Sequence, residues 1–136
     1  MNYLLEILNL PDSNYRKIVL FGLAIFFIFF GIDHFINPEF YLSIMPPKFP
    51  FHLEAVYISG FFEVLGGVGV LVSKFRKIAG WGLVALLVAV YPANIYMALN
   101  ADAFMSISIE LLYFRLALQF LFFYWAYIVT SPAYNK

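Results

Sequence analysis

"IVLFGLAIFFIFFGIDHFINPEFYLSIMPPKFPFH" covers residues 18–52 and decides the fold class. Its first thirteen residues are apolar; an acid beside a histidine follows, and then a connection that contains four prolines. A helix needs about 20 mostly apolar residues to cross the hydrocarbon core of a bilayer. The stretch therefore predicts a transmembrane helix over residues 18–35, followed by a proline-rich connection.

The composition of the whole chain agrees with a membrane protein. Of its 136 residues, 64% are hydrophobic and 12% are charged, whereas soluble domains are roughly 45–50% apolar and about 25% charged. The formal net charge is zero, so the chain lacks the basic excess expected of a nucleic-acid-binding protein. It has no cysteine, which excludes a disulfide framework and thiolate metal or redox chemistry within this chain.

Three further segments have the length and composition of membrane spans, at about residues 53–72, 78–99 and 109–129. Backbone polar groups in lipid must be satisfied within the segment, so we expect all four spans to be helices. The first fifteen residues predict a short interfacial helix, an extension of the first span or a frayed terminus. The expected fold is all-α, a single four-helix transmembrane domain over residues 1–136, in contact with membrane lipid.

The basic residues predict the orientation of the bundle. Most of them lie just before the first span, just after the fourth span or between the second and third spans: Arg16, Lys17, Lys74, Arg76, Lys77 and Lys136. An excess of Lys and Arg marks the cytoplasmic side of a membrane protein. We therefore expect an integral protein of the bacterial inner (plasma) membrane, with both termini cytoplasmic and the proline-rich connection outside.

This orientation predicts a polar layer in the outer half of the bundle. At a rise of 1.5 Å per residue, Glu63 and Gln119 lie about 15 Å and Arg115 about 9 Å along their spans from the outer ends. Asn94 lies in the outer turns of the third span. Gly60, Glu63 and Gly67 share one helix face, and small residues mark close helix contacts in membranes.

Two interpretations of the layer remain open. Glu63 and Arg115 are predicted to pair, directly or through Gln119 or water, because each costs at least roughly 2.5–3.5 kcal/mol alone at the bilayer centre. The polar residues then either hold the helices together or line an outward-facing pocket for a lipophilic molecule with a polar head, such as a quinone. The candidate ligand-binding residues are His34, Glu63, Tyr91, Asn94, Arg115 and Gln119. No metal site is expected, because His34, His52 and Glu54 have no known ligand spacing.

Asp33 and His34 also have two interpretations. His34 titrates near neutral pH and is able to exchange protons with a ligand, but the pair could equally cap the end of the first helix. The prolines of the connection, Pro38, Pro46, Pro47 and Pro50, restrict its conformations and lower the cost of ordering it. The connection is therefore expected to cover the polar layer as a stiff lid.

Four motifs resemble the DoxX-like family of small membrane proteins: "GIDHFINPEFYLSIMPP", "SGFFEVLGGVGVL", "YPANIYMAL" and "RLALQ". The resemblance implies a four-helix membrane bundle, in agreement with the spans. The matched positions are Gly31, His34, Phe35, Pro38, Ser59, Gly60, Glu63, Pro92, Asn94, Arg115 and Gln119. Members of that family are associated with quinone oxidoreductases or oxidative-stress complexes, and animal relatives resemble assembly chaperones of nicotinic receptors.

Three classes of function follow from these observations. The favoured hypothesis is a non-catalytic accessory protein that binds a lipophilic ligand, with quinone or lipid as candidates, or assists the assembly of a membrane-protein partner. The second is a quinol-oxidising or isomerase-type membrane enzyme that uses Glu63 and His34 for proton transfer. The third is a structural subunit of a larger complex or a homo-oligomer, held together by packing alone.

Overall fold

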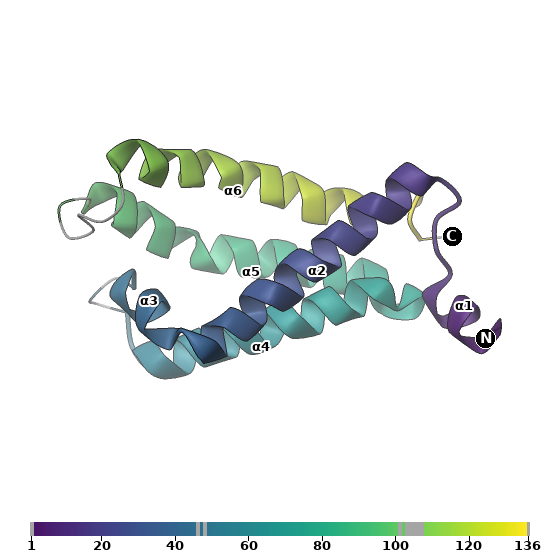
Figure 1. Ribbon diagram of the computed structural model, residues 1–136, viewed down its shortest axis with the longest axis horizontal. Helices are drawn as coiled ribbons and strands as arrows, with labels where there is room; N and C mark the ends of the chain where they lie inside the picture. Colours follow the sequence, from purple (N-terminus) through teal and green to yellow (C-terminus); the bar gives the residue numbers. More distant parts are fainter. Residues whose placement is uncertain (1, 46, 48, 101, 103–107, 136) are drawn as a thin grey trace.

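The computed structural model describes residues 2–45, 47, 49–100, 102 and 108–135. Six helices account for most of this part of the chain, and it contains no strand. The predicted all-α fold is confirmed: four long helices lie side by side as a bundle (Figure 1). Pro46, one of the four prolines predicted to stiffen the connection, lies outside the described residues.

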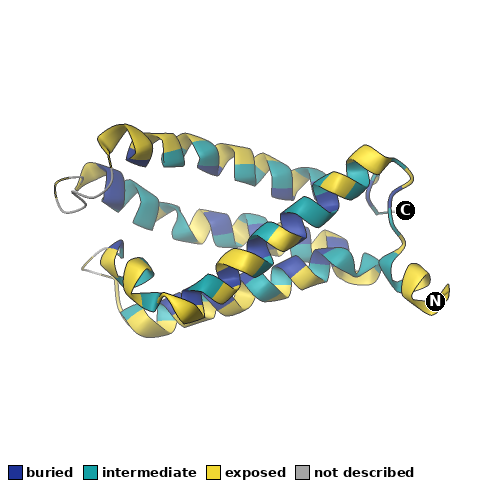
Figure 2. Cartoon of the chain, in the orientation of Figure 1, coloured by how far each residue is buried: buried dark blue, intermediate teal, exposed yellow. Residues whose placement is uncertain are grey.

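The four long helices are α2 (Asn14–Ile36), α4 (His52–Leu71), α5 (Ser73–Leu99) and α6 (Ile109–Val129). Each is long and apolar enough to cross a membrane, which indicates an integral membrane protein. Exposed residues cover their outward surfaces (Figure 2), and many of these are large and apolar. Such a surface suits a lipid solvent.

The third span begins earlier than predicted. The basic residues expected in a turn before residue 78 instead form the first turns of α5, and only Val72 separates α4 from α5. The helix starts here because Arg76 is buried and hydrogen-bonded to the end of α4 rather than exposed in a loop. α5 also continues through Pro92 to Leu99.

Two short helices complete the chain. α1 (Asn2–Leu8) agrees with the expected N-terminal helix and lies beside the C-terminus at one end of the bundle (Figure 1). α3 (Pro38–Ser43) forms within the proline-rich connection, at the opposite end. Pro38 stands at its first position, where a missing N–H costs nothing, and Glu39 follows in its first turn.

The helices pack in chain order, α2 on α4, α4 on α5 and α5 on α6. α2 meets α6 near the end of the bundle that carries the termini, where the Trp125 indole N–H donates to the Val19 carbonyl at 2.9 Å. The rings of Phe26 and Phe122 pack against each other nearby, tilted by 44° with centroids 4.7 Å apart. Beyond these aromatic contacts the two helices diverge toward α3 (Figure 1).

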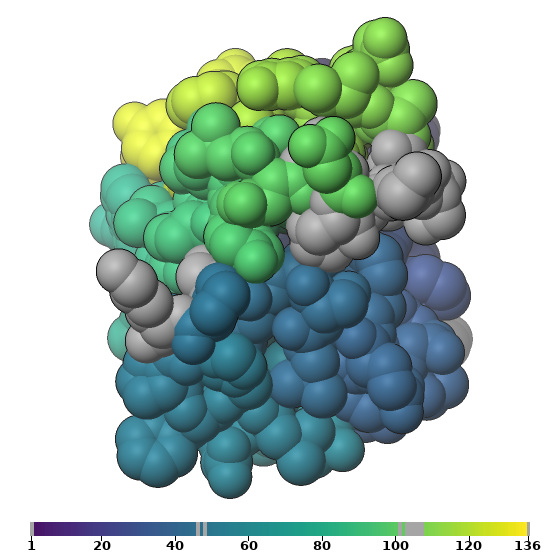
Figure 3. Space-filling model, turned by 90° about the vertical axis from the view of Figure 1, so that its left-hand side faces the viewer, coloured from purple at the N-terminus to yellow at the C-terminus, as the bar shows by residue number. Residues whose placement is uncertain are grey.

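The buried apolar core is divided into two clusters. The larger joins all four long helices near the termini and includes Leu23, Phe27, Leu83 and Ala126. The smaller lies at the other end, where Ile44, just after α3, packs with Met97, Ala98 and Leu112. The connection therefore reaches across the bundle to α5 and α6; Figure 3 shows this end of the molecule, with the segment around α3 against the ends of α5 and α6.

Candidate functional site

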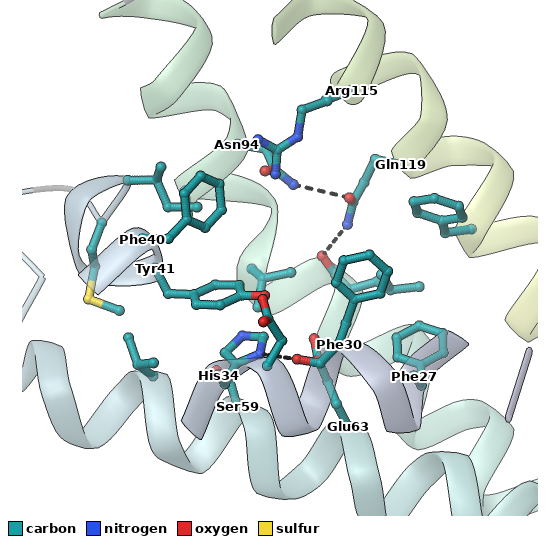
Figure 4. A pocket seen from close by; sticks show the side chains of 18 of the residues that line it. Phe27, Phe30, His34, Phe40, Tyr41, Ser59, Glu63, Asn94, Arg115 and Gln119 are labelled. Atoms are coloured by element: carbon teal, nitrogen blue, oxygen red, sulfur yellow. Dashed lines mark hydrogen bonds and ion pairs between the residues drawn. The ribbon is translucent and has the colours of Figure 1, made fainter. Parts of the chain in front are cut away.

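A cavity of about 460 Å³ separates the two core clusters. Its size falls within the usual range of small-molecule sites, about 300–1,000 Å³. Five helices, α2 to α6, contribute to its walls. Five of the six predicted ligand-binding residues line it together: His34, Glu63, Asn94, Arg115 and Gln119 (Figure 4).

Glu63 is the most deeply buried acid of the described chain, with 9% of its surface exposed. Its Oε2 lies 3.3 Å from Nδ1 of His34. The geometry of that contact does not make a hydrogen bond, and Oε2 has no hydrogen-bond partner among the described residues. The Nδ1–H of His34 instead donates to the Phe30 carbonyl at 2.7 Å. A buried oxygen without a hydrogen bond is costly, so Glu63 retains an unused polar atom beside the cavity.

Gly60 brings Glu63 and His34 together. A Cβ at residue 60 would lie 2.6 Å from Cβ of His34 and 2.8 Å from the carbonyl oxygen of Gly31. Glycine therefore allows α4 to approach α2 at this point. Gly67, about two turns further along the same face, is placed almost as tightly against α2. The predicted face of Gly60, Glu63 and Gly67 is confirmed as a close contact within the chain.

Asp33 holds α3 over the cavity. The Tyr41 hydroxyl donates to one oxygen of its carboxylate at 2.7 Å, and the Asn37 amide donates to the other at 2.6 Å. The Tyr41 ring stacks on His34 with centroids 3.7 Å apart. Burial, and then the hydrogen bond to Asp33, raise the pKa of Tyr41, which keeps the hydroxyl protonated as the donor. Thus Asp33 secures the lid, while His34 lines the cavity.

Asn94 and Gln119 link α5 to α6. The Asn94 amide donates to Oε1 of Gln119 at 3.1 Å, and the Gln119 amide donates to the Leu87 carbonyl at 3.1 Å. These two side chains act partly as the predicted polar link between helices, and they fix the wall of the cavity on that side (Figure 4).

The predicted direct ion pair between Glu63 and Arg115 is wrong, and Gln119 does not bridge the two side chains. The ionic contact of Glu63 is with His34, whereas the Arg115 guanidinium donates to the Met97 sulfur at 3.2 Å and lies 5.8 Å from the centre of the Phe40 ring. The reason is tertiary: the cavity lies between α4 and α6, so the two side chains stand on opposite walls (Figure 4).

Tyr91 is not among the residues that line the cavity. Its ring packs edge-on against Phe120 and Phe123 of α6. The Tyr91 ring therefore packs against α6 instead of contributing to the cavity. The described residues contain no group of three or more His, Asp or Glu side chains placed to hold a metal ion.

Tyr41 and Phe40 are site residues that the sequence did not predict. Both come from α3, which brings them over His34 and Arg115 respectively. The signal was present in "NPEF": Pro at the first position of a helix and Glu in its first turn are typical of a helix start. Which residues that helix would touch depends on how it folds back over the bundle.

The sequence model of a family described as a domain of unknown function (DUF8561) matches residues 23–130. No curated protein and no solved structure matches the chain. The matched range contains α3, α4, α5, α6 and the part of α2 that lines the cavity. Because it also covers well over half of the sequence, the chain belongs to the family described as DUF8561.

Proposed function

We propose that the protein is a membrane-embedded binding protein with an accessory, non-catalytic role, whose cavity holds a lipophilic small molecule with a polar head group. The observation that carries this proposal is the 460 Å³ cavity into whose wall Glu63 places a buried oxygen that no group of the described chain satisfies. A quinone is a candidate ligand, in line with the resemblance to the DoxX-like family.

The walls of the cavity support a ligand rather than a purely structural role. Polar residues that only hold helices together satisfy one another, as Asn94 and Gln119 do. Glu63 and Arg115 lack such mutual contacts, although both line the same space. The remaining walls are aromatic and aliphatic, as expected for a lipophilic ligand with few polar groups.

We further propose that the protein lies in the bacterial inner (plasma) membrane with its termini in the cytoplasm and α3 outside. The support is the position of Arg16, Lys17, Lys74 and Lys77, all near the end of the bundle that carries the termini. The ligand would then be held toward the outer face of the membrane, beneath α3.

The ligand can be sought by extraction. Protein purified in an uncharged maltoside detergent should release a quinone or another lipophile in near-stoichiometric amount on organic extraction, detected by mass spectrometry. Val90→Phe would fill the cavity and should abolish this release. Val88→Phe is the matched control, because Val88 is 58% exposed on the outer surface of α5. Extracts with nothing beyond bulk lipid, or full retention in Val90→Phe, would contradict the proposal.

A second candidate is an enzyme that moves a proton to or from the bound molecule. The proximity of His34 and Glu63 favours it: Nδ1 of His34 lies 3.3 Å from Oε2 of Glu63, and catalytic contacts that are slightly long in a free enzyme often shorten when the substrate binds. Glu63→Gln should then abolish turnover of an added quinol or isomerisable lipid while the ligand still binds. Unchanged turnover in Glu63→Gln would remove Glu63 from such a mechanism.

A further inference from the structure

Arg115 lines the cavity as a cation without an anionic partner. All eight Asp and Glu residues belong to the described part of the chain, and none of them forms an ion pair with its guanidinium. Its contacts are with a thioether sulfur and the face of a phenyl ring. A thioether is a weak acceptor, and neither group carries a negative charge.

The lack of an anionic partner is energetically unfavourable for Arg115 because its guanidinium lies in mostly apolar surroundings. A charge taken out of water is costly unless it is paired and hydrogen-bonded, and a contact with an aromatic face offsets only part of that cost. Oε1 of Gln119 already accepts from the Asn94 amide, and neither Asn94 nor Gln119 carries a negative charge that could balance the guanidinium. The missing negative charge must therefore come from a molecule in the cavity or from the surrounding lipid.

One end of the cavity is apolar and the other is polar, which matches the two ends of an amphipathic molecule. On α6, Phe122 lies about 10 Å along the helix from Arg115, and on α2, Phe26 lies about 12 Å from His34, both toward the large apolar core. On α5, Leu87 and Val90 likewise precede Asn94. The deep part is thus apolar, and the charged group lies nearer α3, whose Phe40 ring faces the guanidinium.

We propose that the ligand is a single-chain lipophilic carboxylic acid, with its carboxylate on Arg115 and its chain among the phenyl rings of the deep part. This inference rests on the proposed binding function and specifies the ligand's head group. The planar fork of Arg matches a carboxylate with two parallel hydrogen bonds. Glu63 stands on the opposite wall beside His34, which supplies its own positive partner when protonated, so it does not compete for Arg115.

The test compares the affinities of a fatty acid and its methyl ester, which share one hydrocarbon chain but differ in the head group. The full-length protein in maltoside detergent is titrated by calorimetry with hexadecanoic acid, its methyl ester and the neutral quinone decylubiquinone. The acid should bind at least tenfold more tightly than the ester. Arg115→Gln should remove this preference, and Arg115→Lys, which keeps the charge and is the second variant if the first does not fold, should retain part of it. Lys77→Gln, which removes an exposed charge outside the cavity, should leave the preference unchanged.

Each contrary outcome has its own meaning. Equal affinities for acid and ester in the wild type would overturn the carboxylate proposal, and binding of either molecule that Val90→Phe abolishes would still support the general binding function. Failure of all three molecules to bind would contradict both. If phosphatidylglycerol from vesicles displaces the acid and remains bound in native mass spectrometry, the partner of Arg115 is a phospholipid head group and the single-chain acid is excluded.

Discussion

Arg76 shows how a single buried residue joins separate parts of the chain. Only 1% of its surface is exposed, yet no carboxylate among the described residues pairs with it. Its guanidinium donates at 2.5–3.2 Å to five backbone carbonyls, those of Leu8, Asn9, Val70, Leu71 and Tyr134. Four of these lie at the ends of α1 and α4, where helix carbonyls lack partners and carry partial negative charge.

We expect Arg76→Lys to destabilise the protein by at least about 2 kcal/mol, because an ammonium cannot span acceptors on three segments and leaves buried carbonyls unsatisfied. Thermal unfolding in detergent, followed by circular dichroism, measures the effect. Lys77→Met is the control, since the adjacent Lys77 side chain is exposed. Unfolding of Arg76→Lys at the wild-type temperature would show that the carbonyl contacts contribute little.

The contact between α2 and α4 is the most extensive between any two helices of the described chain. Glycines on both helices make it close: the built Cβ of Gly31 would lie 2.8 Å from the Gly60 carbonyl oxygen, and that of Gly67 would lie 2.9 Å from the Ala24 carbonyl oxygen. In a membrane, small residues favour helix association by allowing backbones to approach. This contact also sets the distance between Glu63 and His34.

Gly60→Ala should therefore cost about 1–3 kcal/mol by overpacking against His34, and it should lower ligand content by shifting α4 away from α2. Gly82→Ala is the matched control: it also lies in a helix, but its Cβ meets nothing within 4 Å, so the change should be neutral or stabilising by up to about 1 kcal/mol. Equal melting temperatures for the two variants would show that the close contact is not required.

At the scale of the whole molecule, the bundle is closed at one end and hollow toward the other. α2 and α6 meet through Trp125 and Phe26 near the termini, and α3 with Ile44 covers the opposite end. The cavity lies between these two closures. The orientation of the bundle in the membrane therefore determines from which side a ligand reaches the cavity beneath α3.

The orientation can be tested by labelling, because the chain has no native cysteine. Ser43→Cys places a thiol at the end of α3, and Asn14→Cys places one at the start of α2; both positions are exposed. In intact bacterial cells a membrane-impermeant maleimide should label Ser43→Cys, whereas Asn14→Cys should react only after permeabilisation. The reverse pattern would place the termini outside and refute the proposed topology.

Long-range contacts account for the differences between the sequence prediction and the structure. Apolar length and helical spacing sufficed for the four spans and for the shared face of Gly60, Glu63 and Gly67, because these depend on local geometry. The partner of Glu63 did not follow from the same information. Depth along a helix predicted that Arg115 and Glu63 would be at similar levels, but it contains nothing about which helices flank the cavity.

Apolar segment length and the 3.6-residue helical period are enough to predict a bundle of apolar helices with a polar layer of Glu63, Asn94, Arg115 and Gln119 near His34. Packing between the helices was needed to show that Glu63 meets His34, that Tyr41 folds back onto Asp33, and that Arg115 lines the cavity without a carboxylate partner among the described residues. The physical reason is that pairing between helices depends on their order and tilt around the cavity, which side-chain packing along the whole chain sets.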